Sequence, residues 1–511
     1  MISIDLGWVI FAGCILFVIA LNYIVVKYYS DKHESEAITT IIAVIGLTLT
    51  LLCVMLIPVD ILNVSTMSKN GTLIDAGTIA SRTEGVKMLY YILYGSIIGV
   101  SLILVPFAYF FYEEYDENIP VCSRVYAGCK YTVFFVLFAV VLLVVGAFVR
   151  PGSKSIGNEN IDQWIKDEVL NQNAVESSLL FAIACLTILG FAVWITYTAY
   201  GLSAFPIGLI KGNRRTDDDK ADLNKDLFKT REKSSFYSSK YASGKSLTEK
   251  EQSHLSLLKG KERALEKRSD RLDKADRGIK KVLVIFRPFA FIFGFIFILL
   301  SFLIVISLVL AIIDKISSSV CGSACGFLST YPKLKNPFDI VLLDLAPYFP
   351  LDYILLGGLI LYIYVCALSG ITRIGIRFLW INMFEFSYRK TFPQGLLIAS
   401  VLLMLSNLCL NMQIVQLAPR YVMYGTQQFF NATSAALEPC NISAPQGACV
   451  MSQIGSLTSR IQLGTSFFGI IFYYATWVII GFFLVGLVVS IFKKAPSKAQ
   501  YNRYDEYEDE I

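Results

Sequence analysis

The sequence predicts an all-α polytopic membrane protein, and its composition and long apolar runs support that prediction. The 511 residues are 55% hydrophobic and only 17% charged, whereas soluble domains contain about 25% charged residues. The apolar residues form continuous runs of about 18 or more, as in membrane-spanning helices, and do not alternate as in a β-barrel. A soluble multidomain enzyme and a disordered or collagen-like chain are therefore excluded. The net charge of +5 is too small to suggest a nucleic-acid partner.

Nine transmembrane helices are expected from the apolar runs. No basic segment precedes the first run, which is long enough to span, so we expect it to be retained and not cleaved as a signal peptide. Residues 338–348 are apolar but too short to span as a helix, and a re-entrant or interfacial segment is expected there. The predicted spans are residues 7–26, 38–62, 88–112, 131–149, 177–200, 286–313, 352–372, 395–415 and 467–492.

The basic residues predict the orientation in the membrane. Loops on one side hold 33 of the 45 Lys and Arg residues and loops on the other side hold 11, and the basic side is cytosolic. With nine spans, the N-terminus is then luminal and the C-terminus cytosolic. The N-x-S/T sequons, which accept glycans in luminal segments, all fall on the luminal side. They begin at Asn63, Asn70, Asn431 and Asn441, and Asn63 lies so close to the second span that its glycosylation is doubtful.

Changes in composition divide the chain into four parts. Residues 1–200 contain spans one to five. Residues 201–285 form a charged cytosolic insert with 21 basic and 13 acidic residues, which is expected to be partly helical. Residues 286–492 contain spans six to nine, with a glycosylated luminal loop at 416–466. Residues 493–511 form an acidic cytosolic tail.

The second half of the insert, residues 247–281, is predicted to be a helix, because Leu258, Leu265 and Leu272 recur every seven residues. Three heptads make a weak coiled coil, so this helix is expected to pack on another helix of the same chain or on a second subunit in a homodimer. Contact of its basic ends with acidic lipid is the alternative. Residues 213–245 are polar and are expected to be mobile.

Few residues suit catalysis or metal binding. Both histidines, His33 and His254, lie on the predicted cytosolic side, so no histidine site is expected in the spans or the lumen. Residues 243–246 resemble the end of a phosphate-binding loop but lack its first glycine. We therefore expect no enzyme, no metal site and no catalytic cofactor. The luminal cysteines are candidates for disulfides, as the pairs Cys440–Cys449 and Cys321–Cys325.

Polar residues at the spans are the candidates for a ligand pathway, because such residues are costly in a membrane. Asp60, Asp344 and Asp352 lie at luminal ends of spans. They either mark the interface or line a vestibule that accepts hydrogen bonds from an amide-rich ligand. Asn407 and Asn411 share one face of the eighth span, where they either bond to neighbouring helices or line a cavity. Pro206 is expected to end the fifth span at the cytosolic interface, and a hinge there is the alternative.

Eight short segments, in order along the chain, match one known family. They are residues 34–36 (ESE), 58–61 (PVDI), 112–114 (YEE), 196–204 (TYTAYGLSA), 209–212 (LIKG), 349–354 (FPLDYI), 370–375 (GITRIG) and 417–425 (LAPRYVMYG). Together with nine spans and a charged insert after the fifth, they resemble the limb-region (LMBR1-like) membrane protein family. The resemblance is strongest to its members for lysosomal cobalamin transport.

The resemblance implies a multi-pass lysosomal membrane protein required for export of cobalamin (vitamin B12, a cobalt corrinoid) from lysosome to cytosol. It implies a D-subfamily ABC half-transporter as partner, with this chain as a transporter subunit or as the partner's escort. Cobalamin would then be a transported ligand. A cell-surface lipocalin-type receptor at the plasma membrane is the alternative within the family. A proton- or ion-coupled carrier of another solute is disfavoured, because few charges lie at mid-membrane depth.

Overall fold

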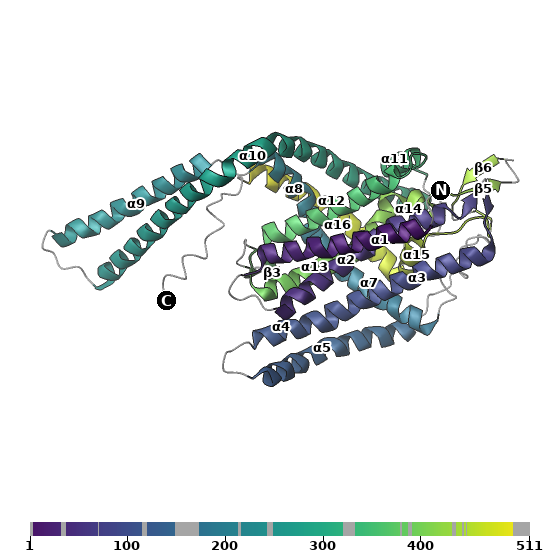
Figure 1. The fold of residues 1–511 in the computed structure, drawn as a ribbon, viewed down its shortest axis with the longest axis horizontal. Coiled ribbons are helices and arrows are strands. Elements are labelled where there is room, and N and C mark those ends of the chain that lie inside the picture. The colour runs from purple at the N-terminus through teal and green to yellow at the C-terminus, as the bar shows by residue number, and fades with distance from the viewer. Residues whose placement is uncertain are drawn as a thin grey trace. The chain divides into compact units, whose positions relative to one another are not determined.

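The computed structural model is predominantly helical (Figure 1). It describes residues 4–31, 37–69, 71–114, 120–148, 173–212, 216–242, 249–319, 333–378, 381–386, 391–431, 436–441, 444–445, 447–464 and 466–493. The chain forms two compact units. The first comprises residues 1–203 and 300–487, and the second comprises residues 204–299 and 488–511.

Within the described ranges, eight helical segments are long and apolar enough to cross a membrane, and they coincide with eight of the predicted spans. They are α2 (Ala37–Ser65), the continuous α3–η1–α4 (Ala76–Gly99, Val100–Leu104, Val105–Glu113), α5 (Val121–Phe148), the continuous α7–η3–α8 (Ala174–Val193, Trp194–Thr198, Ala199–Lys211), residues Pro288–Ser318 of α10, α12 (Leu351–Ile374), α13 (Pro393–Leu417) and α16 (Ser466–Phe492). The remaining predicted span corresponds to α1 (Ile4–Tyr29), which has 26 residues. Its membrane crossing, and with it the count of nine, stays a prediction.

Several helices extend beyond their predicted limits, because capping and tertiary contacts continue where the apolar run stops. The third span starts at Ala76 and not at residue 88, and Asp75 caps it by accepting hydrogen bonds from the amides of Gly77 and Thr78. The fourth span likewise starts at Val121 and not at residue 131.

Pro206 does not end the fifth span, so that prediction is wrong. The helix continues through Pro206 to Lys211. Proline has no amide hydrogen for the carbonyl four residues earlier, which belongs to Leu202. That carbonyl instead accepts a hydrogen bond from Ser301 Oγ at 2.6 Å. The proline therefore leaves no buried acceptor unpaired, and the helix can continue.

The core of the first unit is α13, which packs mainly against α2 and α7. Nearly every side chain of α13 from Leu403 to Leu417 is buried, including its polar ones. A helix that is buried on all faces shows no hydrophobic stripe and depends on its neighbours for every polar contact. These neighbours therefore fix the positions of the polar residues of α13.

Two glycines let α12 approach the helix that contains η3 and α8. A Cβ at Gly201 would collide with the carbonyl oxygen of Cys366, and a Cβ at Gly370 would collide with that of Tyr197. Each helix thus supplies one glycine that lies against the backbone of the other. Such small residues permit the close helix–helix contacts that are common in membrane proteins.

Short elements connect the spans. Residues Pro337–Leu345 form the 9-residue helix α11, which overlaps the 338–348 segment predicted to be interfacial. Antiparallel hairpins are formed by β1 (Ser68–Lys69) with β2 (Thr72–Leu73), β3 (Ile376–Phe378) with β4 (Ile381–Phe384), and β5 (Gln428–Asn431) with β6 (Ala436–Pro439). The two further helices are α14 (Pro419–Tyr424) and α15 (Gln453–Gly464).

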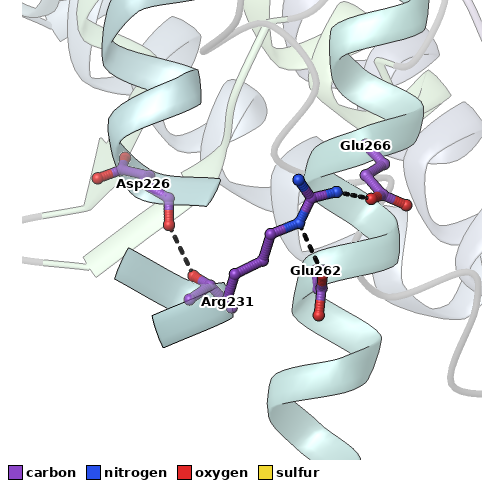
Figure 2. Close-up of polar contacts among 5 residues, drawn as sticks. Asp226, Arg231, Glu262 and Glu266 are labelled. Carbon is purple, nitrogen blue, oxygen red and sulfur yellow. Dashed lines mark hydrogen bonds and ion pairs between the residues drawn. The ribbon is translucent and has the colours of Figure 1, made fainter. Parts of the chain in front are cut away.

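In the second unit, α9 (Thr216–Ala242) pairs with the first part of α10 (Glu249–Ser318). Leu223 and Leu227 of α9 form a cluster with Leu265 of α10. Figure 2 shows Arg231 of α9 reaching Glu262 and Glu266 of α10. Residues 216–242 of the segment predicted to be mobile form the helix α9, and the mobility of the segment stays a prediction. Leu265, one of the heptad leucines of α10, packs on α9, so α9 is a partner helix within the same chain.

Replacing Gly370 with alanine is expected to destabilise the protein, because the new methyl group would press on the Tyr197 carbonyl; overpacking of this kind costs about 1–3 kcal/mol or more. The matched control is Gly358→Ala in the same helix, where a Cβ meets no atom within 4 Å. Thermal unfolding in detergent should show a lower midpoint for the first variant and an unchanged or slightly higher one for the second. Equal midpoints would contradict the close contact.

Candidate functional site

Three buried carboxylates hold the segment between α13 and α16. Asp60 of α2 is fully buried, and its Oδ2 accepts a hydrogen bond from the Ile454 amide at 2.9 Å. Asp339 of α11 accepts hydrogen bonds from the amides of Tyr421 at 3.0 Å and Arg420 at 3.3 Å. Asp352 of α12, which is 1% exposed, accepts a hydrogen bond from Tyr421 Oη at 2.6 Å.

Two of these carboxylates cap short helices from outside. The first amides of an α-helix have no partner within the helix, and a negative charge there is favourable. Asp60 meets this need at the start of α15, and Asp339 meets it at the start of α14. These hydrogen bonds connect residues that are far apart in the sequence. Backbone amides replace water as the donors to each buried carboxylate.

The predicted vestibule residues have different environments. Asp60 and Asp352 are buried in these contacts, whereas Asp344 is exposed on α11. None of the three lines the cavity of about 410 Å³ that lies beside α14. A role for them in a ligand pathway stays a proposal, and the contacts described above give Asp60 and Asp352 a structural role.

Asn407 and Asn411 lie in the buried centre of α13. Asn407 Nδ2 donates to the carbonyl of Thr50 in α2. Asn411 Nδ2 donates to Tyr94 Oη at 3.0 Å and lies 3.6 Å from Cys53 Sγ. Both side-chain amides therefore form hydrogen bonds to neighbouring helices. This was the first of the two predicted alternatives; the second was that they line a cavity.

Farther along α13, Gln413 and Gln416 are buried, and none of their side-chain amide atoms has a hydrogen-bond partner in the part of the chain that the structure describes. Buried amides without protein partners are commonly met by ordered water. The polar positions of this helix thus fall into two groups, one bonded to neighbouring helices and one without protein partners.

The 416–466 segment supplies most of the residues that line the cavity. Gly425 has φ +58°, and a Cβ there would collide with Ser65 Oγ, so only glycine fits this turn. The side-chain amide of Gln427 is fully occupied, since it donates to the carbonyls of Tyr424 and Val450 and accepts from the Val450 amide. A disulfide joins Cys440 to Cys449, with Cα atoms 5.9 Å apart.

The sequon asparagines differ in their surroundings. Asn431 ends β5, and its Nδ2 donates to Glu438 Oε1 at 2.9 Å, while Asn441 follows β6. Asn63 lies within the last turn of α2, which is an unfavourable site for a glycan. Asn70, Cys321 and Cys325 lie outside the described residues, so the predictions for them stay predictions.

The sequence analysis did not identify the roles of Asp339 and Arg420 or the helix α15. Asp339 entered the sequence analysis only as part of the interfacial segment 338–348, and Arg420 was not singled out. A signal for α15 was present: Ser452 precedes it, and Ile454, Leu457 and Ile461 follow at helical spacing. In the structure, Ser452 Oγ accepts a hydrogen bond from the Gly455 amide at 3.1 Å.

The fold and these contacts define a polytopic helical membrane protein. Within the described ranges, no group of three or more His, Cys, Asp or Glu residues could hold a metal ion. The model of the LMBR1-like membrane protein family matches residues 8–284, and the chain belongs to this family.

Full-length relatives agree with this assignment. The chain is 76% identical to the probable lysosomal cobalamin transporter of Dictyostelium discoideum, over 100% of both chains. It is 33% identical to the protein of the same name from Nematostella vectensis, over 99% of this chain and 98% of the relative. It is 34% identical to the lysosomal cobalamin transport escort protein LMBD1 of Danio rerio, over 96% and 93%. No solved structure matches the chain.

Asp339 should make the stability of the protein depend on pH. Burial raises the pKa of its carboxyl from 3.8 to about 6, and the amides of Tyr421 and Arg420 oppose this rise. The folded protein therefore binds this proton more tightly than the unfolded chain. The contribution of Asp339 to the free energy of unfolding is therefore fully present below about pH 4, and it is lost as the pH rises through about 6. A shift of about two pKa units corresponds to roughly 3 kcal/mol.

Thermal unfolding of the purified protein between pH 4 and pH 7 measures this effect. The Asp339→Asn variant should lose this part of the pH dependence, whereas Asp344→Asn, an exposed site on the same helix, should keep it. Parallel curves for Asp339→Asn and the unchanged protein would show that Asp339 does not titrate in this range.

Proposed function

We propose that this protein is a multi-pass protein of the lysosomal membrane that is required for export of cobalamin from lysosome to cytosol. The observation that supports this most strongly is the 76% identity to the Dictyostelium discoideum relative along the whole of both chains. The relatives are named as transporters or as escort proteins and not as enzymes, which fits a protein without catalytic activity.

The partner in this proposal is a D-subfamily ABC half-transporter, which would supply ATP hydrolysis. An escort, the word in the names of several relatives, needs a transporter to accompany. A homodimer of this chain is a further proposal, which the size of the purified particle would check. The chain itself lies in the lipid bilayer, and its exposed apolar residues on α5 and α16 suit contact with acyl chains.

The packing favours the escort role over that of the conductor. In the first unit, side chains fill the space around α13, and its two asparagines bond to neighbouring helices. The cavity beside α14 has about 410 Å³. Pockets of about 300–1,000 Å³ hold drug-sized molecules, and cobalamin, with its corrin ring and nucleotide loop, is larger than these. Among the described residues around α13, a path for the whole molecule would require rearrangement of the neighbouring helices.

The proposed orientation places the 416–466 segment and its disulfide in the lumen, with the C-terminus in the cytosol. Its support is the clustering of basic residues on the other side and the shared side of all four sequons. A disulfide between Cys440 and Cys449 suits an oxidising compartment. Glycans on Asn70, Asn431 and Asn441 would follow from this orientation.

Reconstitution in liposomes separates the two roles. Vesicles loaded with labelled cobalamin would contain this chain alone, the ABC partner alone, both proteins, or neither. We expect no export from vesicles with this chain alone, and ATP-dependent export from vesicles with the partner alone. Export by this chain alone would make it the conductor and overturn the escort role.

A cellular experiment tests the function as a whole. Cells that lack this chain should retain labelled cobalamin in their lysosomes, and under the escort role the partner should fail to reach the lysosome. Normal export of cobalamin from lysosomes without this chain would contradict the proposed function.

A further inference from the structure

The cavity beside α14 is formed by three separate segments of the first unit. Leu343, Ala346 and Pro347 come from α11 and the turn after it. Arg420, Gly425 and Thr426 come from α14 and the following turn. The third wall belongs to the β5–β6 hairpin and the disulfide, and it comprises Gln428, Pro439 and Cys440. Its volume of about 410 Å³ is large enough for a small polar group and its substituents.

Arg420 gives this cavity an available positive charge. Its backbone amide donates to Asp339, but its guanidinium makes no hydrogen bond or ion pair to any residue that the structure describes. A guanidinium stays charged at every physiological pH and presents five donors in a planar fork. The charge of Arg420 acts on the Asp339 carboxyl at longer range, but the donors of its half-buried guanidinium are not used by the described residues and can bind an external anion.

Neighbouring donors complete the site. The Thr426 hydroxyl and the Gln428 amide are exposed, and neither makes a hydrogen bond within the described part of the chain. The Gly425 turn fixes the position of Thr426, whose amide donates to Ser65 Oγ at 3.2 Å. The side chains of α11 add apolar surface.

The charges around the cavity favour an anion. Among the described residues that line it, Arg420 is charged and none is acidic. Three carboxylates adjoin the lining residues without lining the cavity themselves: Asp339, whose oxygens accept from the backbone amides of α14, Asp344 and Glu438. The charge that the described lining residues present to a ligand is therefore that of Arg420.

The pH of the compartment indicates which class of anion the cavity binds. This step rests on the proposed orientation, in which the cavity opens to the acidic lumen of the lysosome. Carboxylates have an ordinary pKa near 4 and begin to lose their charge in acid, whereas a phosphodiester remains ionised. We propose that this cavity is a phosphodiester-binding site, with Arg420 as the charged donor and Thr426 and Gln428 as further donors.

Two sources supply a phosphodiester at this position. Cobalamin contains one in its nucleotide loop, so the site would hold that end of the ligand while the corrin ring stays outside the cavity. A phospholipid headgroup of the luminal leaflet contains the same group. The exposed Ile340 and Val341 of α11 offer apolar surface for its acyl chains.

The test uses the purified full chain in nanodiscs at pH 5. In phosphatidylcholine nanodiscs, calorimetry would compare cobalamin with cobinamide, a corrinoid that lacks the phosphodiester and its nucleotide. If cobalamin is the source, we expect it to bind about tenfold or more tightly than cobinamide, because charge-assisted hydrogen bonds are lost with the phosphate. Arg420→Gln should abolish the difference, and Arg420→Lys should keep part of it.

The second arm addresses the lipid source. Native mass spectrometry of protein from nanodiscs with phosphatidylglycerol should show retained anionic lipid for the unchanged chain and its loss for Arg420→Gln. Lys335→Gln, which removes an exposed charge just before α11, is the control for general charge effects. Matching thermal midpoints for all variants would exclude misfolding as the cause.

The outcomes separate this inference from the proposed function. If Arg420→Gln changes neither corrinoid discrimination nor lipid retention, the site is overturned, even where cells still need the chain for cobalamin export. If lipid retention depends on Arg420 while cells export cobalamin without the chain, the site stands and the proposed function falls.

Discussion

Pairing of polar groups away from water is the constraint on which the rest of the structure depends. In hydrocarbon, an unpaired backbone amide or carbonyl costs several kcal/mol. The Leu202 carbonyl, left without a partner by Pro206, is therefore met by Ser301. The amides at the starts of α14 and α15, which have no partner within their own helices, donate to Asp339 and Asp60. The helix that contains Pro206 and the 416–466 segment therefore meet the same requirement, which is that each buried polar backbone group has a hydrogen-bond partner.

The spans were predictable because apolar runs are a local property. Eight predicted spans coincide with helices of suitable length, yet their ends differ where capping or pairing extends them. Asp75 begins α3 well before its apolar part. In the polar segment that forms α9, Leu223 and Leu227 pack on Leu265 of α10, and Arg231 pairs with two carboxylates of α10. These extensions depend on partners that hydropathy does not reveal.

The candidate site was less accessible to sequence reasoning, because its contacts join residues hundreds of positions apart. Asp60 was singled out as costly near a membrane, but its partner, the Ile454 amide, lies 394 residues away. Asp352 and its partner Tyr421 are separated by 69 residues, which is also too far for a local sequence pattern to reveal the contact. The spacing of Asn407 and Asn411 did show that they share a face, while only packing shows that α2 and α3 receive their hydrogen bonds.

The paired glycines of α8 and α12 limit how the first unit can move. Because Gly201 lies on the Cys366 carbonyl and Gly370 lies on that of Tyr197, sliding or rotating one helix against the other would drive side chains into the opposite backbone. Tightly packed backbones of this kind yield little. At this contact the two helices therefore stay together, and a conformational change of the first unit would have to displace both of them as one body.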